Sequence, residues 1–204
     1  MNNNQEERKW SENLILVDAD YIDRVAFDLS VNFERMLGRQ IPKADMAMWA
    51  DYVALDGGIR PGKNLIQVLL VHRKSKVRMD NFEPSDFDKE LTDMGFNDGI
   101  GDFVFGAYAT EEDIVTHGDY FVDILRLMMT QKEVKRLIVV PNGEDDNIIY
   151  KVREALNRLD DDTKRVTLLT MVSVPGGAYR QDSLGFSLMA ALGIRSEEIN
   201  NVMD

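Results

Sequence analysis

The chain has 204 residues, with 36 acidic against 24 basic side chains, which gives a formal net charge of −12. This balance and a pI near 4.6 exclude a domain that grips nucleic acid through a wide basic face or docks on an anionic membrane surface. The chain has no cysteine, so it carries no disulfide, thiolate zinc site or cysteine nucleophile.

The N-terminal segment, 1–11, is rich in Asn, Gln and Glu and lacks the apolar core of a signal peptide. We expect a disordered tail there and a single domain over 12–204, since a chain of this length fits one domain. No apolar run approaches the ~20 residues that a membrane span needs. We therefore expect a soluble, cytoplasmic protein that makes no membrane contact.

Five apolar runs predict strands. They are nearly continuous in β-branched, aromatic and Leu residues, as is typical of parallel strands covered on both faces. The predicted strands are Asn13–Val17, Asn64–Val71, Asp102–Ala109, Arg136–Val140 and Arg165–Val174.

Amphipathic segments between these runs predict helices. A first helix over 22–37 ends at Gly38, a second lies between Pro42 and Gly57, and Ser85 is the expected N-cap of a third. Further helices are predicted over 121–128, 148–159 and 183–192 and after Ser196, and 95–101 is predicted to be a plain turn. The alternation predicts an α/β fold, a three-layer α/β/α domain with a mainly parallel sheet of about five strands.

Acidic side chains gather where ligands bind in such a sheet, at the carboxyl ends of the strands. They follow the first and fourth predicted strands and lie on the helix before the fourth. If they converge, their carboxylates suit Mg²⁺ or Mn²⁺, hard cations that prefer oxygen ligands and that assist phosphoryl transfer. The candidate metal ligands are Asp18, Asp20, Asp119, Asp123, Asp145 and Asp146.

Most of these acids also have a structural explanation. Asp20, Asp119 and Asp145 stand near predicted helix starts, where carboxylates cap free N–H groups and favour the helix dipole. Asp18 differs, because it directly follows a continuous apolar strand at the ligand-binding edge.

A basic stretch, His72–Arg78, follows the second predicted strand. Its Arg73, Lys74 and Lys76 are candidates for contacting the phosphates of single-stranded RNA, although a solvated strand exit would have the same composition. His117 precedes Asp119 and is a further candidate for the site.

Two segments, VDADYID and HGDYFVDILRLMMTQKEVKRLIVVPNGEDD, occur in an order that resembles the NYN branch of PIN-like ribonuclease domains. The resemblance implies a PIN/NYN-like fold and metal-dependent hydrolysis of phosphodiesters. It implies catalytic roles for Asp18 at the first strand, Asp119 and Asp123 on the helix, and Asp145 in the turn after the fourth strand.

Several features depart from that family's pattern, including the narrow four-residue spacing of Asp119 and Asp123 and the extra length of 40–62. Gly143 stands where the family has its first turn Asp, and Tyr21 stands where it has Asn. Two hypotheses therefore stay open: an active Mg²⁺- or Mn²⁺-dependent ribonuclease, and the same scaffold without nuclease activity.

Two other functions are also open. The acidic surface and the eleven Met suit a non-enzymatic interaction module or a homodimer. The opening ILVDADYI also resembles haloacid-dehalogenase-like phosphatases, which would make Asp18 a nucleophile, Asp20 a general acid/base and Thr110 a phosphate contact.

Overall fold

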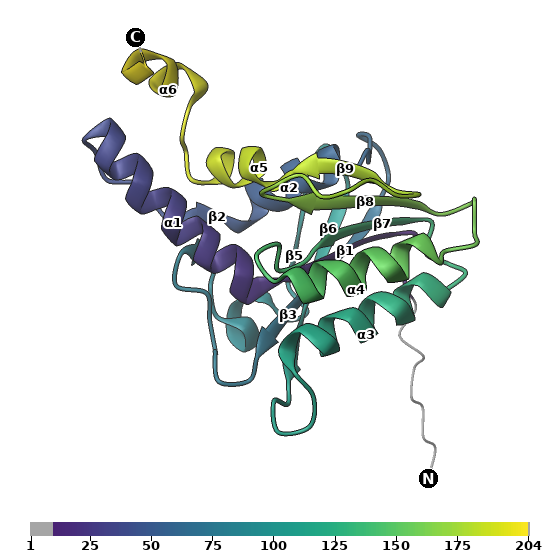
Figure 1. Cartoon of the computed structure of the whole chain (residues 1–204). Helices are drawn as coiled ribbons and strands as arrows, with labels where there is room; N and C mark the ends of the chain where they lie inside the picture. The colour runs from purple at the N-terminus through teal and green to yellow at the C-terminus, as the bar shows by residue number, and fades with distance from the viewer. Residues whose placement is uncertain (1–9, 204) are drawn as a thin grey trace.

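A seven-stranded sheet runs through the centre of the computed structural model, which describes residues 10–203 (Figure 1). Its strands are β1 (Asn13–Asp18), β3 (Leu65–Arg73), β5 (Gly95–Asn97), β6 (Asp102–Thr110), β7 (Arg136–Val140), β8 (Arg165–Thr170) and β9 (Arg180–Ser183). They lie in the order β5-β6-β3-β1-β7-β8-β9, and every neighbouring pair is parallel except β5 with β6. Two short strands, β2 (Ala44–Asp45) and β4 (Phe82–Glu83), pair outside this sheet.

Helices cover both faces of the sheet (Figure 1). One face packs against α1 (Ala19–Leu37), α2 (Met46–Asp56) and α5 (Leu184–Ala191), and the other against α3 (His117–Thr130) and α4 (Asp146–Asn157). A short helical turn, η1 (Phe87–Leu91), belongs to the first layer, and α6 (Ser196–Met203) ends the chain near α1.

Strand β1 shows why the apolar runs are continuous. Ile15 and Val17 belong to the core under α1 and α2, whereas Leu14 and Leu16 belong to the core under α3 and α4. All four side chains are fully buried, because successive residues of a strand point to opposite faces and both faces are covered. The predicted three-layer α/β architecture with a mainly parallel sheet is confirmed at this level.

The five predicted strands form the centre of the sheet, and the fifth ends at Thr170 rather than at Val174. The third predicted helix is present but shorter than expected and is capped by Asp86 rather than Ser85, and the plain turn predicted over 95–101 is wrong. Helical structure ends at Leu91, and Gly95–Asn97 adds an antiparallel edge strand to β6. A side-chain carbon at Gly95 would lie 2.2 Å from the carbonyl oxygen of Phe103, so the chains approach this closely only because residue 95 is glycine.

The predicted tail, 1–11, lies outside the described residues except for its last two. Trp10 packs against the core under α3, and Ser11 is buried with its N–H donating to Oε1 of Gln67 at 3.0 Å. These two residues therefore belong to the folded part of the chain. Within residues 10–203, no helix combines the length and apolar character needed to cross a bilayer.

The order of the parallel strands places the expected ligand site. Numbered along the chain, they lie in the order 3-2-1-4-5-6, so the direction of winding reverses between β1 and β7. In doubly wound sheets, ligands bind outside the carboxyl ends of the strands at such a reversal. Asp18, the last residue of β1, lies at this point.

Candidate functional site

A pocket of about 500 Å³ opens at the carboxyl ends of β1 and β3. Its walls come from the first turns of α1, the exit of β3, the start of α3 and the loop after β7. The side chains that line it include three carboxylates, three cations, a histidine and two aromatic rings. These are Asp18, Asp20, Asp80, Arg24, Arg73, Lys76, His117, Tyr21 and Phe27.

Asp18 joins β1 to α1 without a loop between them. It is the N-cap of α1, and its Oδ1 accepts a hydrogen bond from the backbone N–H of Tyr21 at 3.0 Å. Nε2 of His117 lies 3.1 Å from the same oxygen. Only 2% of Asp18 is exposed, so this carboxylate caps the helix from a buried position beside the imidazole.

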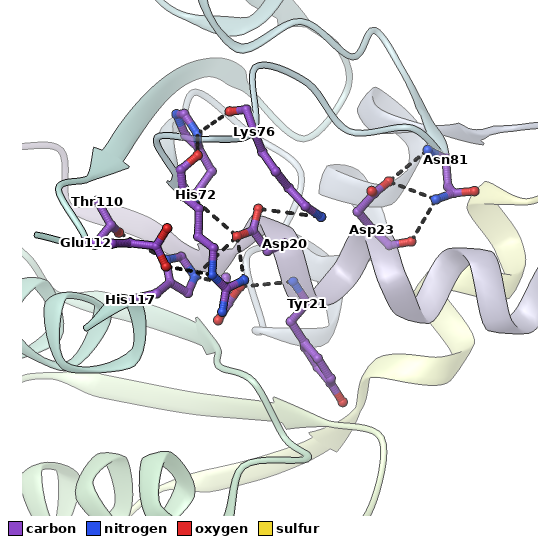
Figure 2. A network of polar contacts seen from close by, with 11 residues as sticks. Asp20, Tyr21, Asp23, His72, Lys76, Asn81, Thr110, Glu112 and His117 are labelled. Atoms are coloured by element: carbon purple, nitrogen blue, oxygen red, sulfur yellow. Dashed lines mark hydrogen bonds and ion pairs between the residues drawn. The ribbon is translucent and has the colours of Figure 1, made fainter. Parts of the chain in front are cut away.

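His117, the first residue of α3, lies between a hydroxyl and two carboxylates (Figure 2). Its Nδ1 is 3.0 Å from Oγ1 of Thr110, and its Nε2 is 4.0 Å from Oδ2 of Asp20 in addition to its contact with Asp18. When the Thr110 hydroxyl donates to Nδ1, the ring proton resides on Nε2 and faces the carboxylates. The histidine thus links the ends of β1 and β6.

Asp20 connects the first turn of α1 to the exit of β3. Its Oδ2 accepts from the backbone N–H of Arg73 at 3.1 Å and from the Arg73 guanidinium at 3.0 Å. Its Oδ1 lies 4.0 Å from Nζ of Lys76 and is buried without a hydrogen-bond partner within residues 10–203 (Figure 2). The pocket therefore contains a buried carboxylate oxygen that is free to accept a hydrogen bond.

His72 holds the turn of the basic stretch that follows β3. Its ring stacks on Phe87 with 3.8 Å between ring centres, and Nδ1 lies 3.0 Å from the carbonyl oxygens of both Arg73 and Lys76. Because carbonyls only accept, Nδ1 carries a proton and donates to this turn. The turn directs Arg73 and Lys76 to the pocket, whereas Lys74 pairs with Glu111 at 2.7 Å and does not line it.

Four of the six candidate metal ligands lie elsewhere. Asp119 pairs with Lys151 at 2.6 Å, and this contact holds the pKa of its carboxyl below the usual range. Asp123 is exposed and lies 3.3 Å from Arg126. Asp145 caps α4, Asp146 is exposed in its first turn, and neither lines the pocket.

The structure thus brings Asp18 and Asp20 together and separates the other four acids from them. Within the described part of the chain, no three His, Asp or Glu side chains are arranged to hold a metal ion. The residues present therefore do not fit the multi-acid metal centre that the resemblance implies. A ligand in this pocket would contact the carboxylates, cations and histidine that line it.

Tyr21 and Gly143 lie against each other in the structure, which the sequence did not predict. A side-chain carbon at Gly143 would lie 3.0 Å from the hydroxyl oxygen of Tyr21. Burial, and secondarily the charge of Glu144, raise the pKa of Tyr21 to about 12, so the phenol stays protonated at neutral pH. Nothing in the sequence indicated that His117 contacts Thr110. The sequence did indicate that His117 belongs to the site, because His117 lies just before Asp119 in the chain.

These features define a doubly wound α/β domain with a polar pocket at the carboxyl edge of its sheet. Residues 7–199 match the Family of unknown function (DUF6621), and the chain belongs to that family. Neither the curated proteins nor the solved structures contain a match to the chain.

Proposed function

We propose that this chain is an NYN/PIN-like domain that binds the phosphate backbone of single-stranded RNA in the pocket beside Asp18 and Asp20, without the metal centre needed for cleavage. The observation that carries the proposal is the composition of the pocket lining. Arg73 and Lys76 from the exit of β3 face the same pocket as Arg24 and Phe27 from α1.

The cations that line the pocket are suited to bind the negative charge of a phosphodiester. Lys76 is the least committed of them, since its amine is 4.0 Å from Asp20 and its side chain is 41% exposed. Arg24 pairs with Glu144 at 2.8 Å, but both side chains are about half exposed, so solvent weakens the pair. Both cations can turn to a bound phosphate at little cost.

Phe27 adds a surface for a base. Its side chain is 53% exposed although it lines the pocket, and bases of any sequence stack on aromatic faces. Arg24 lies over the neighbouring Tyr21 ring, 5.5 Å from its centre. Cations and an exposed ring in one pocket are what a sequence-tolerant single-strand site requires.

The two buried carboxylates have a positioning role in this proposal. Asp20 accepts two hydrogen bonds from Arg73 and so fixes the direction of its guanidinium, while Asp18 fixes the start of α1. The remaining acids of the ribonuclease pattern lie outside the pocket: Asp119 pairs with Lys151, Asp123 lies beside Arg126, and Asp145 caps α4. Their positions support binding without hydrolysis.

The test is fluorescence anisotropy with a labelled single-stranded RNA of about 12 nucleotides at low salt, in EDTA and in Mn²⁺, together with a cleavage assay. We expect binding in both conditions, no cleavage, and a three- to tenfold weaker affinity for Lys76→Gln, since one phosphate contact is lost. Lys74→Gln is the matched control, because it removes the same charge outside the pocket.

Two results would overturn the proposal. One is an affinity for RNA that is absent or falls equally in both lysine variants. The other is Mn²⁺-dependent cleavage that Asp18→Asn abolishes, which would establish an active ribonuclease at this site instead.

A further inference from the structure

Three arginines begin three neighbouring strands at the amino edge of the sheet, opposite the pocket of Asp18. Arg136 is the first residue of β7, Arg165 of β8 and Arg180 of β9. In the sheet register Arg136 lies directly beside Arg165, and Arg180 lies beside Thr167, two residues further along β8. Parallel pairing thus brings together three cations that are far apart in the sequence.

These arginines line a cavity of about 370 Å³. Gly57, at the end of α2, closes one side of it, and Nη1 of Arg136 donates to the Gly57 carbonyl oxygen at 2.8 Å. A side-chain carbon at Gly58 would lie 3.1 Å from Nη1 of Arg136 and 3.9 Å from Nη1 of Arg180. Gly58 also has a φ of +80°, so backbone conformation and space both favour glycine where the arginines converge.

The charges of this cluster are only partly compensated. Arg180 pairs with Asp182 at 2.8 Å, and Lys164, which also lines the cavity, is held by Asp161 at 3.7 Å. Arg136 and Arg165 form no ion pair with any residue in 10–203. Two adjacent guanidinium groups therefore line one cavity, and no acidic side chain of residues 10–203 forms an ion pair with either.

The guanidinium groups of this cluster repel one another. Like charges directly opposite each other on neighbouring strands destabilise a sheet. Burial, together with the charges of Arg165 and Arg180, lowers the pKa of Arg136 below its ordinary value. In a chain with a net charge of −12, acidic side chains are abundant, yet none pairs with Arg136 or Arg165 among the described residues.

We propose that the cavity at the amino edge of the sheet binds a phosphate-bearing anion of about the size of inorganic diphosphate, held by Arg136, Arg165 and Arg180. A guanidinium presents parallel N–H donors that match two phosphate oxygens, and neighbouring arginines can grip both ends of a diphosphate. The site shares no lining residue with the pocket of Asp18, so it stands independently of the proposed RNA binding.

Isothermal titration calorimetry of the full chain with inorganic diphosphate tests this proposal, with sodium sulfate at matched ionic strength as the reference anion. We expect saturable binding of diphosphate, at least tenfold weaker in Arg165→Gln. Arg35→Gln removes the same charge from an exposed site on α1 and should bind as the parent does.

Thermal unfolding without ligand checks that Arg165→Gln folds. Because the substitution removes a repelling charge, its melting temperature at low salt should equal or exceed that of the parent, and diphosphate should no longer raise it. Sulfate binding as tight as diphosphate, or equal affinity loss in Arg165→Gln and Arg35→Gln, would overturn the proposal. So would the absence of saturable diphosphate binding by the parent chain.

Discussion

The hydroxyl oxygen of Tyr21 fills the space beside Gly143, 3.0 Å from where a side-chain carbon of residue 143 would lie. These are two of the points at which the sequence departs from the NYN pattern, and the fold places them side by side. A side chain at residue 143 therefore requires Tyr21 to shift by a few tenths of an ångström. The two departures are physically coupled.

A double-mutant cycle measures this coupling. Gly143→Asp should destabilise the chain by about 1 kcal/mol, since Tyr21 must move by a few tenths of an ångström. In a Tyr21→Asn background the same substitution should cost little or nothing, which leaves a coupling energy of about 1 kcal/mol. Urea denaturation of the four proteins gives these values, and strictly additive effects would contradict the contact.

Asp18 should show two separable contributions to stability. Asp18→Asn keeps an oxygen that can accept from the Tyr21 N–H but removes the charge facing His117. Asp18→Ala loses both, so we expect it to be less stable than Asp18→Asn by about 1 kcal/mol, the usual value of a helix N-cap. Equal free energies of unfolding for the two variants would rule out the capping role.

Asp119 should matter little for either stability or RNA binding. Its ion pair with Lys151 is partly exposed, and such pairs contribute about 0–1 kcal/mol. Lys151 lowers the pKa of Asp119 in the folded chain. The ion pair therefore contributes fully at a pH above the pKa that Asp119 has in the unfolded chain, and the contribution is lost as the pH falls through the lower pKa of the folded chain. Asp119→Asn should lose less than about 1 kcal/mol at pH 7 in urea denaturation and retain the parent's RNA affinity.

Asp51 on α2 should make stability depend on pH in the opposite direction. Burial, followed by the neighbouring Asp98 carboxyl, raises its pKa to about 7, whereas the unfolded value is about 3.9. Between these two pH values Asp51 is therefore protonated in the folded chain and ionised in the unfolded chain. The free energy of unfolding falls as the pH rises through this window. Asp51→Asn should remove this loss and be more stable than the parent by about 1 kcal/mol at pH 8, after solvent screening.

Melting temperatures of parent and Asp51→Asn at pH 5 and pH 8 measure this effect. The parent should melt lower at pH 8 relative to the variant, and the two should converge at pH 5. Parallel pH profiles would show that Asp51 ionises normally. Glu198 is the contrasting case, because its contact with Arg39 lowers its pKa to about 2 and keeps it charged throughout this range.

The sequence alone predicted the layers of the fold because burial on both faces leaves a continuous apolar run, as in β1 and β7. It did not predict β5, whose residues carry no apolar run and pair only because Gly95 lets the backbone approach Phe103. Local patterns determine buried strands, whereas edge strands depend on a partner elsewhere in the chain.

The site was predictable to a similar extent. Asp18 and Asp20 follow a buried strand, and the rule for parallel sheets places them correctly at the ligand edge. Whether Asp119 joins them depends on Lys151, a residue on another helix, which no local pattern reveals. The arginine cluster escaped prediction for the same reason, since strand register alone unites Arg136 with Arg165.

Strand β7 contributes to both candidate sites, because Arg136 begins it and the loop after Val140 reaches the pocket of Asp18. Its five residues separate the two edges by ~17 Å, about twice the Debye length in physiological salt. An anion at one edge therefore exerts little electrostatic force on a ligand at the other. Two negatively charged ligands can occupy the domain at the same time, and their stabilising effects on the fold should add.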